Sequence, residues 1–237
     1  MKFKIIYEDN DLLVINKPAG IVVFPEDKIT GKTLIENLIR RSPNLKKVGK
    51  CPRYGAVHRL DKETSGIFLV AKNNKTLELL QQQFQSREAI KKYLALVVGN
   101  LREEQGVIET LIGRSPKDGR KQKVYLPYEP ASAGKRPALT EYKVLKRLKD
   151  YSLLEIYPKT GRKHQIRTHL SYLGHPIAGD KMYGFKNQIC PKDLKRHFLH
   201  ASYLKIQLKS GEKSTVPTQE FNSELPKSLK TVLNHLK

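Results

Sequence analysis

Short apolar runs separated by turns dominate the chain and predict a strand-rich fold. Runs at 3–7 and 12–16 flank an acidic turn and predict a hairpin. Alternating or β-branched apolar residues predict further strands at 66–72, 91–99, 108–112, 123–126, 138–148, 152–157 and 198–208. Apolar residues at helical spacing predict helices at 33–41, 73–87, 162–173 and 223–237. Many strands with hairpin spacing and few helices predict an α+β fold with a mixed, mostly antiparallel sheet flanked by helices.

The composition is strongly basic. Among 237 residues, 45 are Lys or Arg and 23 are Asp or Glu, so the formal net charge is +22 at pH 7. Such an excess weakens the compact state through self-repulsion, and a bound polyanion is the usual compensation. Nucleic acid is therefore the first partner to expect. A solvated, Lys-rich surface would give the same composition.

Length, hydropathy and cysteine content exclude several classes of protein. The length suits one domain over residues 1–237, built as a single unit or as two halves. No apolar run is long enough to cross a membrane, and the N-terminal residues lack the apolar core of a signal peptide. Cys51 and Cys190 are far apart, and neither belongs to a CxxC motif, so a disulfide framework or zinc site is not expected. We therefore expect a cytoplasmic protein.

Three polar segments could carry chemistry: 57–66, 91–93 and 159–169. In the first, Asp61 lies in a turn rich in Thr, Ser and Gly, where an aspartate often only caps the backbone. It could also act as a carboxylate nucleophile or general base, kept ionised by Arg59 or Arg162. Tyr93 begins a predicted strand and could be a plain core aromatic.

The third segment spans a junction between a strand and a helix. Arg162 is expected in the first turn of the helix, where free N–H groups favour anions, although it could be an ordinary surface arginine. His164 and His169 are five residues apart, which does not suit a zinc pair on one helix face. Ser65 lies close to two other triad-type residues, but no Gly-x-Ser-x-Gly elbow surrounds it, so a hydrolase triad is not expected.

Taken together, these segments resemble the motifs of the RluA/RluD-type pseudouridine synthases. Residues 58–66 (HRLDKETSG) resemble the HRLDxxTSG signature of that family. Further segments resemble other motifs of the family and occur in the family's order along the chain, at 7–20, 92–95, 134–142, 160–169, 174–184 and 199–201. The similarity runs from about residue 3 to about residue 220, which is nearly the whole chain.

The resemblance implies a pseudouridine synthase catalytic fold, with an active-site cleft across the sheet, and an isomerase that converts uridine in RNA to pseudouridine. It places Asp61 on the essential aspartate, Tyr93 on the tyrosine that stacks on the target base, and Arg162 on the arginine that pairs with the aspartate. It leaves open whether the aspartate attacks the base, attacks the sugar or removes a sugar proton. An RNA-binding protein or chaperone that uses this fold without catalysis is the alternative.

The same resemblance assigns substrate-binding residues. Ile166 falls on the apolar residue that lines the base pocket, and Arg59 is expected to support flipping of the uridine out of the RNA. His58 and Leu60, in the same signature, are further candidates for substrate binding. The implied partner is ribosomal or transfer RNA, with no cofactor, no metal and no membrane, and we expect a monomer.

Two departures from the family pattern affect this expectation. Phe24 stands where many relatives have histidine. The sequence starts with residues that resemble the first catalytic strand, so we expect no separate N-terminal RNA-binding domain. RNA would then be held by the catalytic domain. Candidate basic clusters lie at 40–41, 46–47, 117–123 and 135–136, although any one of them could be a solvated face.

Overall fold

The computed structural model describes residues 3–25, 33–208 and 218–236. The chain divides into two compact units. Unit 1 comprises Met1–Ile90 and Ala201–Glu224, and unit 2 comprises Lys91–His200 and Leu225–Lys237. The sequence-based prediction of a single domain over the whole chain stays a prediction.

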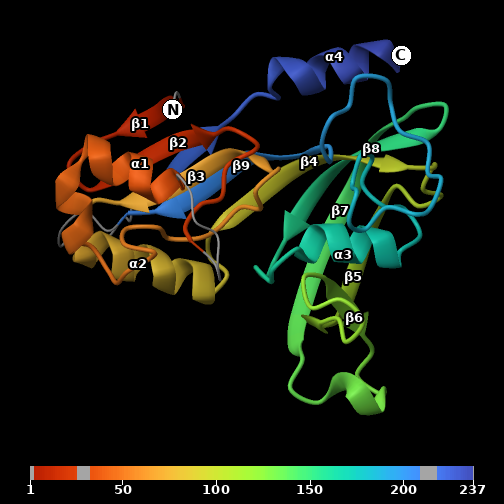
Figure 1. Ribbon diagram of the computed structural model, residues 1–237, viewed down its shortest axis with the longest axis horizontal. Coiled ribbons are helices and arrows are strands. Elements are labelled where there is room, and N and C mark those ends of the chain that lie inside the picture. The colour runs from red at the N-terminus through yellow and green to blue at the C-terminus, as the bar shows by residue number, and fades with distance from the viewer. Residues whose placement is uncertain (1–2, 26–32, 209–217, 237) are drawn as a thin grey trace. The chain divides into compact units, whose positions relative to one another are not determined.

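The described residues of unit 1 form antiparallel strand pairs, the helices α1 and α2 and a 3₁₀ turn (Figure 1). Its strands follow the order β1, β2, β3, β9, and β10 pairs with β9. The bounds are β1 (Lys4–Glu8), β2 (Leu12–Lys17), β3 (Ser65–Ala71), β9 (Leu199–Gln207, whose first two residues belong to unit 2) and β10 (Thr218–Asn222). The helices are α1 (Leu34–Arg41), the 3₁₀ turn η1 (Pro43–Lys47) and α2 (Asn74–Gln85).

Local sequence explains these elements. Every residue of β3 is buried, which fits its continuous apolar sequence. Thr33 caps α1: its side chain accepts from the Glu36 N–H, while the Glu36 carboxylate accepts from the Thr33 N–H. Asn73 caps α2 by accepting from Thr76 N–H. The apolar faces of β2, β3, β9 and α2 then form one core cluster.

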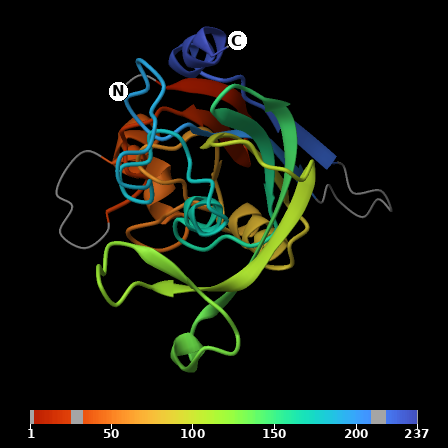
Figure 2. The ribbon, with the colours of Figure 1, turned by 90° about the vertical axis from the view of Figure 1, so that its right-hand side faces the viewer.

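Unit 2 is built on an antiparallel sheet in the order β4, β8, β7, β5, β6 (Figure 2). The bounds are β4 (Ile90–Val98, whose first residue belongs to unit 1), β5 (Gln105–Arg114), β6 (Gln122–Tyr125), β7 (Arg136–Arg147) and β8 (Tyr151–Pro158). The helices are α3 (Gln165–Tyr172), α4 (Lys227–His235) and the 3₁₀ turn η2 (Pro130–Ser132). Residues of α3 and α4 pack into the same core as β4 and β8.

The α+β class and the mostly antiparallel sheet are confirmed, with corrections to individual elements. The helix expected at 162–173 begins only at Gln165, because His164 has a left-handed backbone with φ of 55°. The helix expected at 223–237 begins at Lys227, after Pro226, and residue 237 lies outside the described residues. Strand β10 was not expected. No helix of the described residues is long and apolar enough to cross a membrane.

Candidate active site

The loop that carries Asp61 lies in unit 1, directly before β3. Leu60 is buried and Asp61 half-buried, and the Asp61 carbonyl accepts from Thr64 N–H at 3.1 Å. The four predicted residues His58, Arg59, Leu60 and Asp61 are thus consecutive in one loop. The structure fixes the turn around Asp61 through the backbone and leaves its side chain partly accessible.

His58 anchors this loop to the core of unit 1. Its Nε2 accepts from the backbone N–H of Leu69 at 3.1 Å. Its ring stacks on Phe84, with centroids 5.1 Å apart, and packs at a tilt against Phe68. These contacts give His58 a structural position, and the expected role in substrate binding stays a prediction.

Lys17, the last residue of β2, also holds the Asp61 loop. The residue is 0% exposed, and its Nζ donates to the Pro18 carbonyl at 2.9 Å and to the Lys62 carbonyl at 3.1 Å. Gly20 N–H donates to the same Lys62 carbonyl at 2.9 Å. Sequence reasoning missed this residue because it ended the strand at Asn16. The available signal was the strand period of two residues, which puts Lys17 on the same side of the strand as the apolar Leu13 and Ile15.

Phe24 is more than a packing residue. Its buried ring lies under two guanidinium groups, with the Cζ of Arg53 at 5.0 Å and that of Arg59 at 5.8 Å from the ring centroid. An aromatic face attracts such cations. Phe24 therefore helps to hold Arg59, which precedes Asp61 by two residues.

Tyr93 lies in unit 2, on β4, opposite Ile156 of β8. Its side chain is partly buried and packs against the core cluster that contains Ile166. Lys91 precedes it by two residues, and burial together with the charge of Lys159 lowers the pKa of Lys91 to about 8. Tyr93 and Ile166, predicted from separate motifs, therefore contact the same cluster.

The turn that carries Arg162 is held by a buried amide. The Oε1 of Gln165 accepts from Arg162 N–H at 2.9 Å and from the Thr160 hydroxyl at 2.8 Å, while its Nε2 donates to the Leu139 carbonyl of β7. The Arg162 Nε donates to the Pro137 carbonyl at 2.9 Å. Arg162 lies before α3, so the expectation that it occupies the first helical turn was wrong.

A second network braces the start of α3. Arg167 and Asp180 form a buried bidentate ion pair, in which Nε and Nη2 donate to the two carboxylate oxygens at 2.7 and 2.9 Å. The Arg167 guanidinium also lies over the Tyr183 ring. The Tyr183 hydroxyl forms a 2.8 Å hydrogen bond with His164 Nδ1. Burial would raise the pKa of Asp180, but the Arg167 guanidinium keeps it below its usual value. This chain of contacts fixes His164, and with it the direction of the turn.

His169 is a buried structural histidine. Its ring nitrogens lie 3.1 Å from the Thr110 hydroxyl and 2.9 Å from the Thr140 hydroxyl. Burial lowers the pKa of His169 to about 4, so the ring is neutral at pH 7. In the described part of the chain, no group of three or more His, Cys, Asp or Glu side chains is arranged to hold a metal ion.

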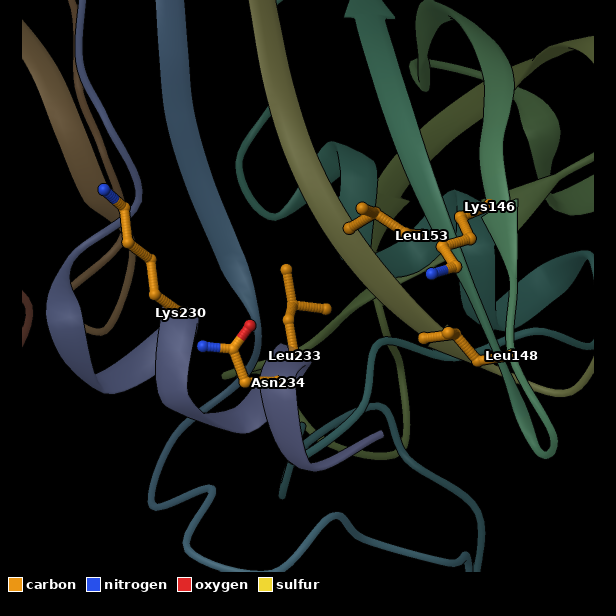
Figure 3. A pocket seen from close by; sticks show the side chains of 6 residues that line it. All are labelled: Lys146, Leu148, Leu153, Lys230, Leu233 and Asn234. Carbon is orange, nitrogen blue, oxygen red and sulfur yellow. The ribbon is translucent and has the colours of Figure 1, made fainter. Parts of the chain in front are cut away.

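A pocket of about 300 Å³ opens between α4 and the β7–β8 hairpin of unit 2 (Figure 3). Three leucines and three polar residues line it: Leu148, Leu153, Leu233, Lys146, Lys230 and Asn234. None of the residues predicted from the motifs lies among them.

Comparison with known proteins identifies the family. The model of the RNA pseudouridylate synthase family matches residues 11–172, a range that includes the Asp61 loop, Tyr93 and the Arg162 turn. The chain belongs to this family. The predicted relationship and fold are therefore confirmed.

Curated relatives of the chain are named as pseudouridine synthases. An uncharacterized RNA pseudouridine synthase of Aquifex aeolicus is 45% identical over 192 residues, which is 80% of this chain and 58% of that protein. The ribosomal large subunit pseudouridine synthase D of Borreliella burgdorferi is 39% identical over 229 residues, covering 94% of this chain and 65% of that protein. The chain thus spans about three fifths of the length of these relatives.

A solved family structure has the same fold. Human RNA pseudouridylate synthase domain containing 4 superposes with a TM-score of 0.74 at 27% identity, covering 98% of this chain and 92% of that one. The fold similarity therefore extends over both units, including the residues outside the family match.

Proposed function

We propose that this chain isomerises uridine in RNA to pseudouridine. The observation that carries the proposal is the Asp61 loop, which has the family signature HRLDKETSG. The backbone of this loop accepts a hydrogen bond from buried Lys17, and Asp61 itself is half-buried. In the reaction the bond from uracil N1 to the sugar C1′ breaks, the base turns and C5 bonds to C1′. The C5 proton leaves and N1 gains one, so substrate and product have the same atoms.

Asp61 is the group that we expect to carry the chemistry. Attack on the base or sugar, or removal of a sugar proton, requires an ionised carboxylate. The family resemblance supports Arg162 as the cation that favours this charge and Tyr93 as the ring that stacks on the base. Stacking on an aromatic side chain recovers ~1–3 kcal/mol of the free energy lost when the base leaves the helix.

Substrate binding is assigned on the same resemblance. Arg59, held over Phe24, is proposed to support the flipped-out state of the nucleotide. Ile166 is proposed to line the base pocket, and His58 and Leu60 to support it from the Asp61 loop. The enzyme is proposed to work as a cytoplasmic monomer without cofactor or metal.

Ribosomal or transfer RNA is the proposed substrate. The name of the Borreliella burgdorferi relative refers to the large ribosomal subunit, which favours ribosomal RNA. The basic composition, with a formal net charge of +22, supports a polyanionic substrate of either kind.

Tritium release tests this function. RNA labelled with [5-³H]uridine is prepared from cells that lack the gene, and we expect the purified protein to release tritium from C5 into water. The same RNA from cells that express the gene is the control, because its target positions are already modified. Absence of release from every RNA fraction would reject catalysis and favour an RNA-binding protein with this fold.

A further inference from the structure

Three residues of unit 2, Lys123, Gly113 and Lys135, lie on β6, on β5 and directly before β7. Lys123 of β6 lies opposite Gly113 of β5 in the sheet register. A Cβ atom at Gly113 would lie 2.3 Å from the Cδ of Lys135, so the Lys135 side chain crosses directly over this glycine. The missing side chain at Gly113 thus leaves room for the Lys135 side chain to cross the strand, with Lys123 at the paired position of β6.

The two lysines share one aromatic ring. The Nζ of Lys123 and the Nζ of Lys135 each lie 5.0 Å from the centroid of the Tyr125 ring. The ring is fixed, because Tyr125 is 2% exposed and its hydroxyl donates to the Arg114 carbonyl at 3.0 Å. Attraction to the ring holds both ammonium groups beside Tyr125 despite their like charge.

No carboxylate neutralises this pair in the described part of the chain. Neither ammonium group takes part in a salt bridge there, whereas nearby Arg120 pairs with Asp118. Two like charges confined to one site raise the electrostatic potential between them and favour an anion from solution. The surrounding hairpin extends the positive charge, with Lys117, Lys121 and Arg136 in the same segment.

We propose that Lys123 and Lys135 bind two phosphodiester groups of the RNA strand beside the Tyr125 ring, one phosphate for each lysine. The choice of RNA rests on the proposed function and on the length of the basic segment, which suits a polyanion better than a single small anion. These contacts would position the RNA on the β5–β6–β7 strands without reading its sequence.

Salt-dependent binding tests the proposal without requiring turnover. The probe is a fluorescein-labelled RNA stem–loop with uridines in the loop, and anisotropy gives its Kd between ~50 and ~200 mM KCl. The Lys123→Gln/Lys135→Gln double variant is expected to reduce the slope of log Kd against log salt by ~2, since each phosphate contact contributes ~1. Lys123→Arg/Lys135→Arg should keep the wild-type slope.

Two further variants control for charge and for geometry. Lys227→Gln/Lys230→Gln on α4 removes the same charge from exposed positions of the same unit and is expected to keep the wild-type slope. Gly113→Ala keeps every charge but displaces Lys135, so it is expected to weaken binding. An unlabelled competing RNA should displace the probe. Inorganic phosphate, added at the same concentration of phosphate groups, should leave the probe bound.

The outcomes separate this proposal from the proposed function. A wild-type slope in the Lys123→Gln/Lys135→Gln variant would overturn the proposal. The two lysines would then only pack over the Tyr125 ring. An equal loss of slope in the α4 control would also overturn it, because bulk charge would then explain the effect. Displacement by inorganic phosphate would overturn the assignment to RNA. Failure of tritium release would reject only the catalytic function, since the slopes are measured without catalysis.

Discussion

The Asp61 loop and the Arg162 turn solve the same structural problem in different ways. Each holds a polar side chain on irregular backbone whose carbonyl and N–H groups need partners. The Asp61 loop takes its partner from a distant part of the sequence, the buried ammonium of Lys17. The Arg162 turn takes its partners from its own motif, through the neutral amide of Gln165. The difference teaches that one brace depends on a single buried charge, whereas the other is a neutral network that also ties the turn to β7.

The two braces should therefore respond differently to substitution. Removal of one partner from a buried hydrogen bond leaves the other unsatisfied and costs ~1–3 kcal/mol. Removal of one partner from a buried ion pair costs more, because a charge remains without compensation. Substitutions in the two regions can thus separate chemistry from support.

The largest expected effect is on catalysis and comes from Asp61→Asn. This substitution removes the carboxylate and leaves the contacts of Lys17 and Gln165 in place. We expect kcat for tritium release to fall at least ~1,000-fold, as for other enzymes that lose a nucleophile or base. Affinity for the RNA stem–loop and the thermal unfolding midpoint should stay close to wild type, because the amide has nearly the same shape. Loss of RNA binding together with turnover would contradict the separate role assigned to Asp61.

Asp180→Asn tests the network that supports the Arg162 turn. It leaves the Arg167 guanidinium buried opposite a neutral amide, so we expect the free energy of unfolding to fall by ~3–5 kcal/mol. Urea denaturation at pH 7 measures the change.

Asp118→Asn is the matched control for this ion pair. It removes the carboxylate of the Asp118–Arg120 pair, in which the arginine side chain is 83% exposed. We expect little or no loss in the free energy of unfolding there, because water screens an exposed pair. Equal losses in both variants would show that the Arg167–Asp180 pair is not a special support of the turn.

The sequence predicted the parts of these regions that follow local rules. The helix from Leu34 was found because its apolar residues recur at helical spacing, and the capping box of Thr33 and Glu36 fixes the same start. The start of α3 was misplaced because the left-handed backbone of His164 is stabilised by Tyr183, a contact that no local pattern reveals. Strand β10 was missed because its five residues include only one buried apolar side chain, Phe221, and its pairing with β9 is not local.

Prediction of the candidate site shows the same limit. Asp61, Tyr93 and Arg162 were selected because motif resemblance identifies residues by type and order. The supporting residues Lys17 and Gln165 were not selected as supports, since a lysine after an apolar strand gives no indication of which carbonyl it contacts. Their roles depend on tertiary contacts such as the one between Lys17 and Lys62.

Lys17→Met tests the brace of the Asp61 loop, with a smaller expected effect on stability than Asp180→Asn. The Lys62 carbonyl keeps its bond from Gly20 N–H, and removal of a buried charge offsets part of the loss. We therefore expect the free energy of unfolding to fall by only ~1–3 kcal/mol. Because the loop is less well fixed, kcat for tritium release should fall ~10-fold or more while KM for RNA changes little.

Lys62→Gln is the matched control for Lys17→Met, because it removes an exposed charge next to Asp61 but keeps the carbonyl that Lys17 contacts. It should leave kcat near the wild-type value. If the two variants lose kcat equally, charge near Asp61 explains the effect and the Lys17 contact does not. If Lys17→Met lowers stability as expected but keeps the wild-type kcat, Lys17 supports the fold of unit 1 without positioning Asp61, and the contrast with the Arg162 turn fails.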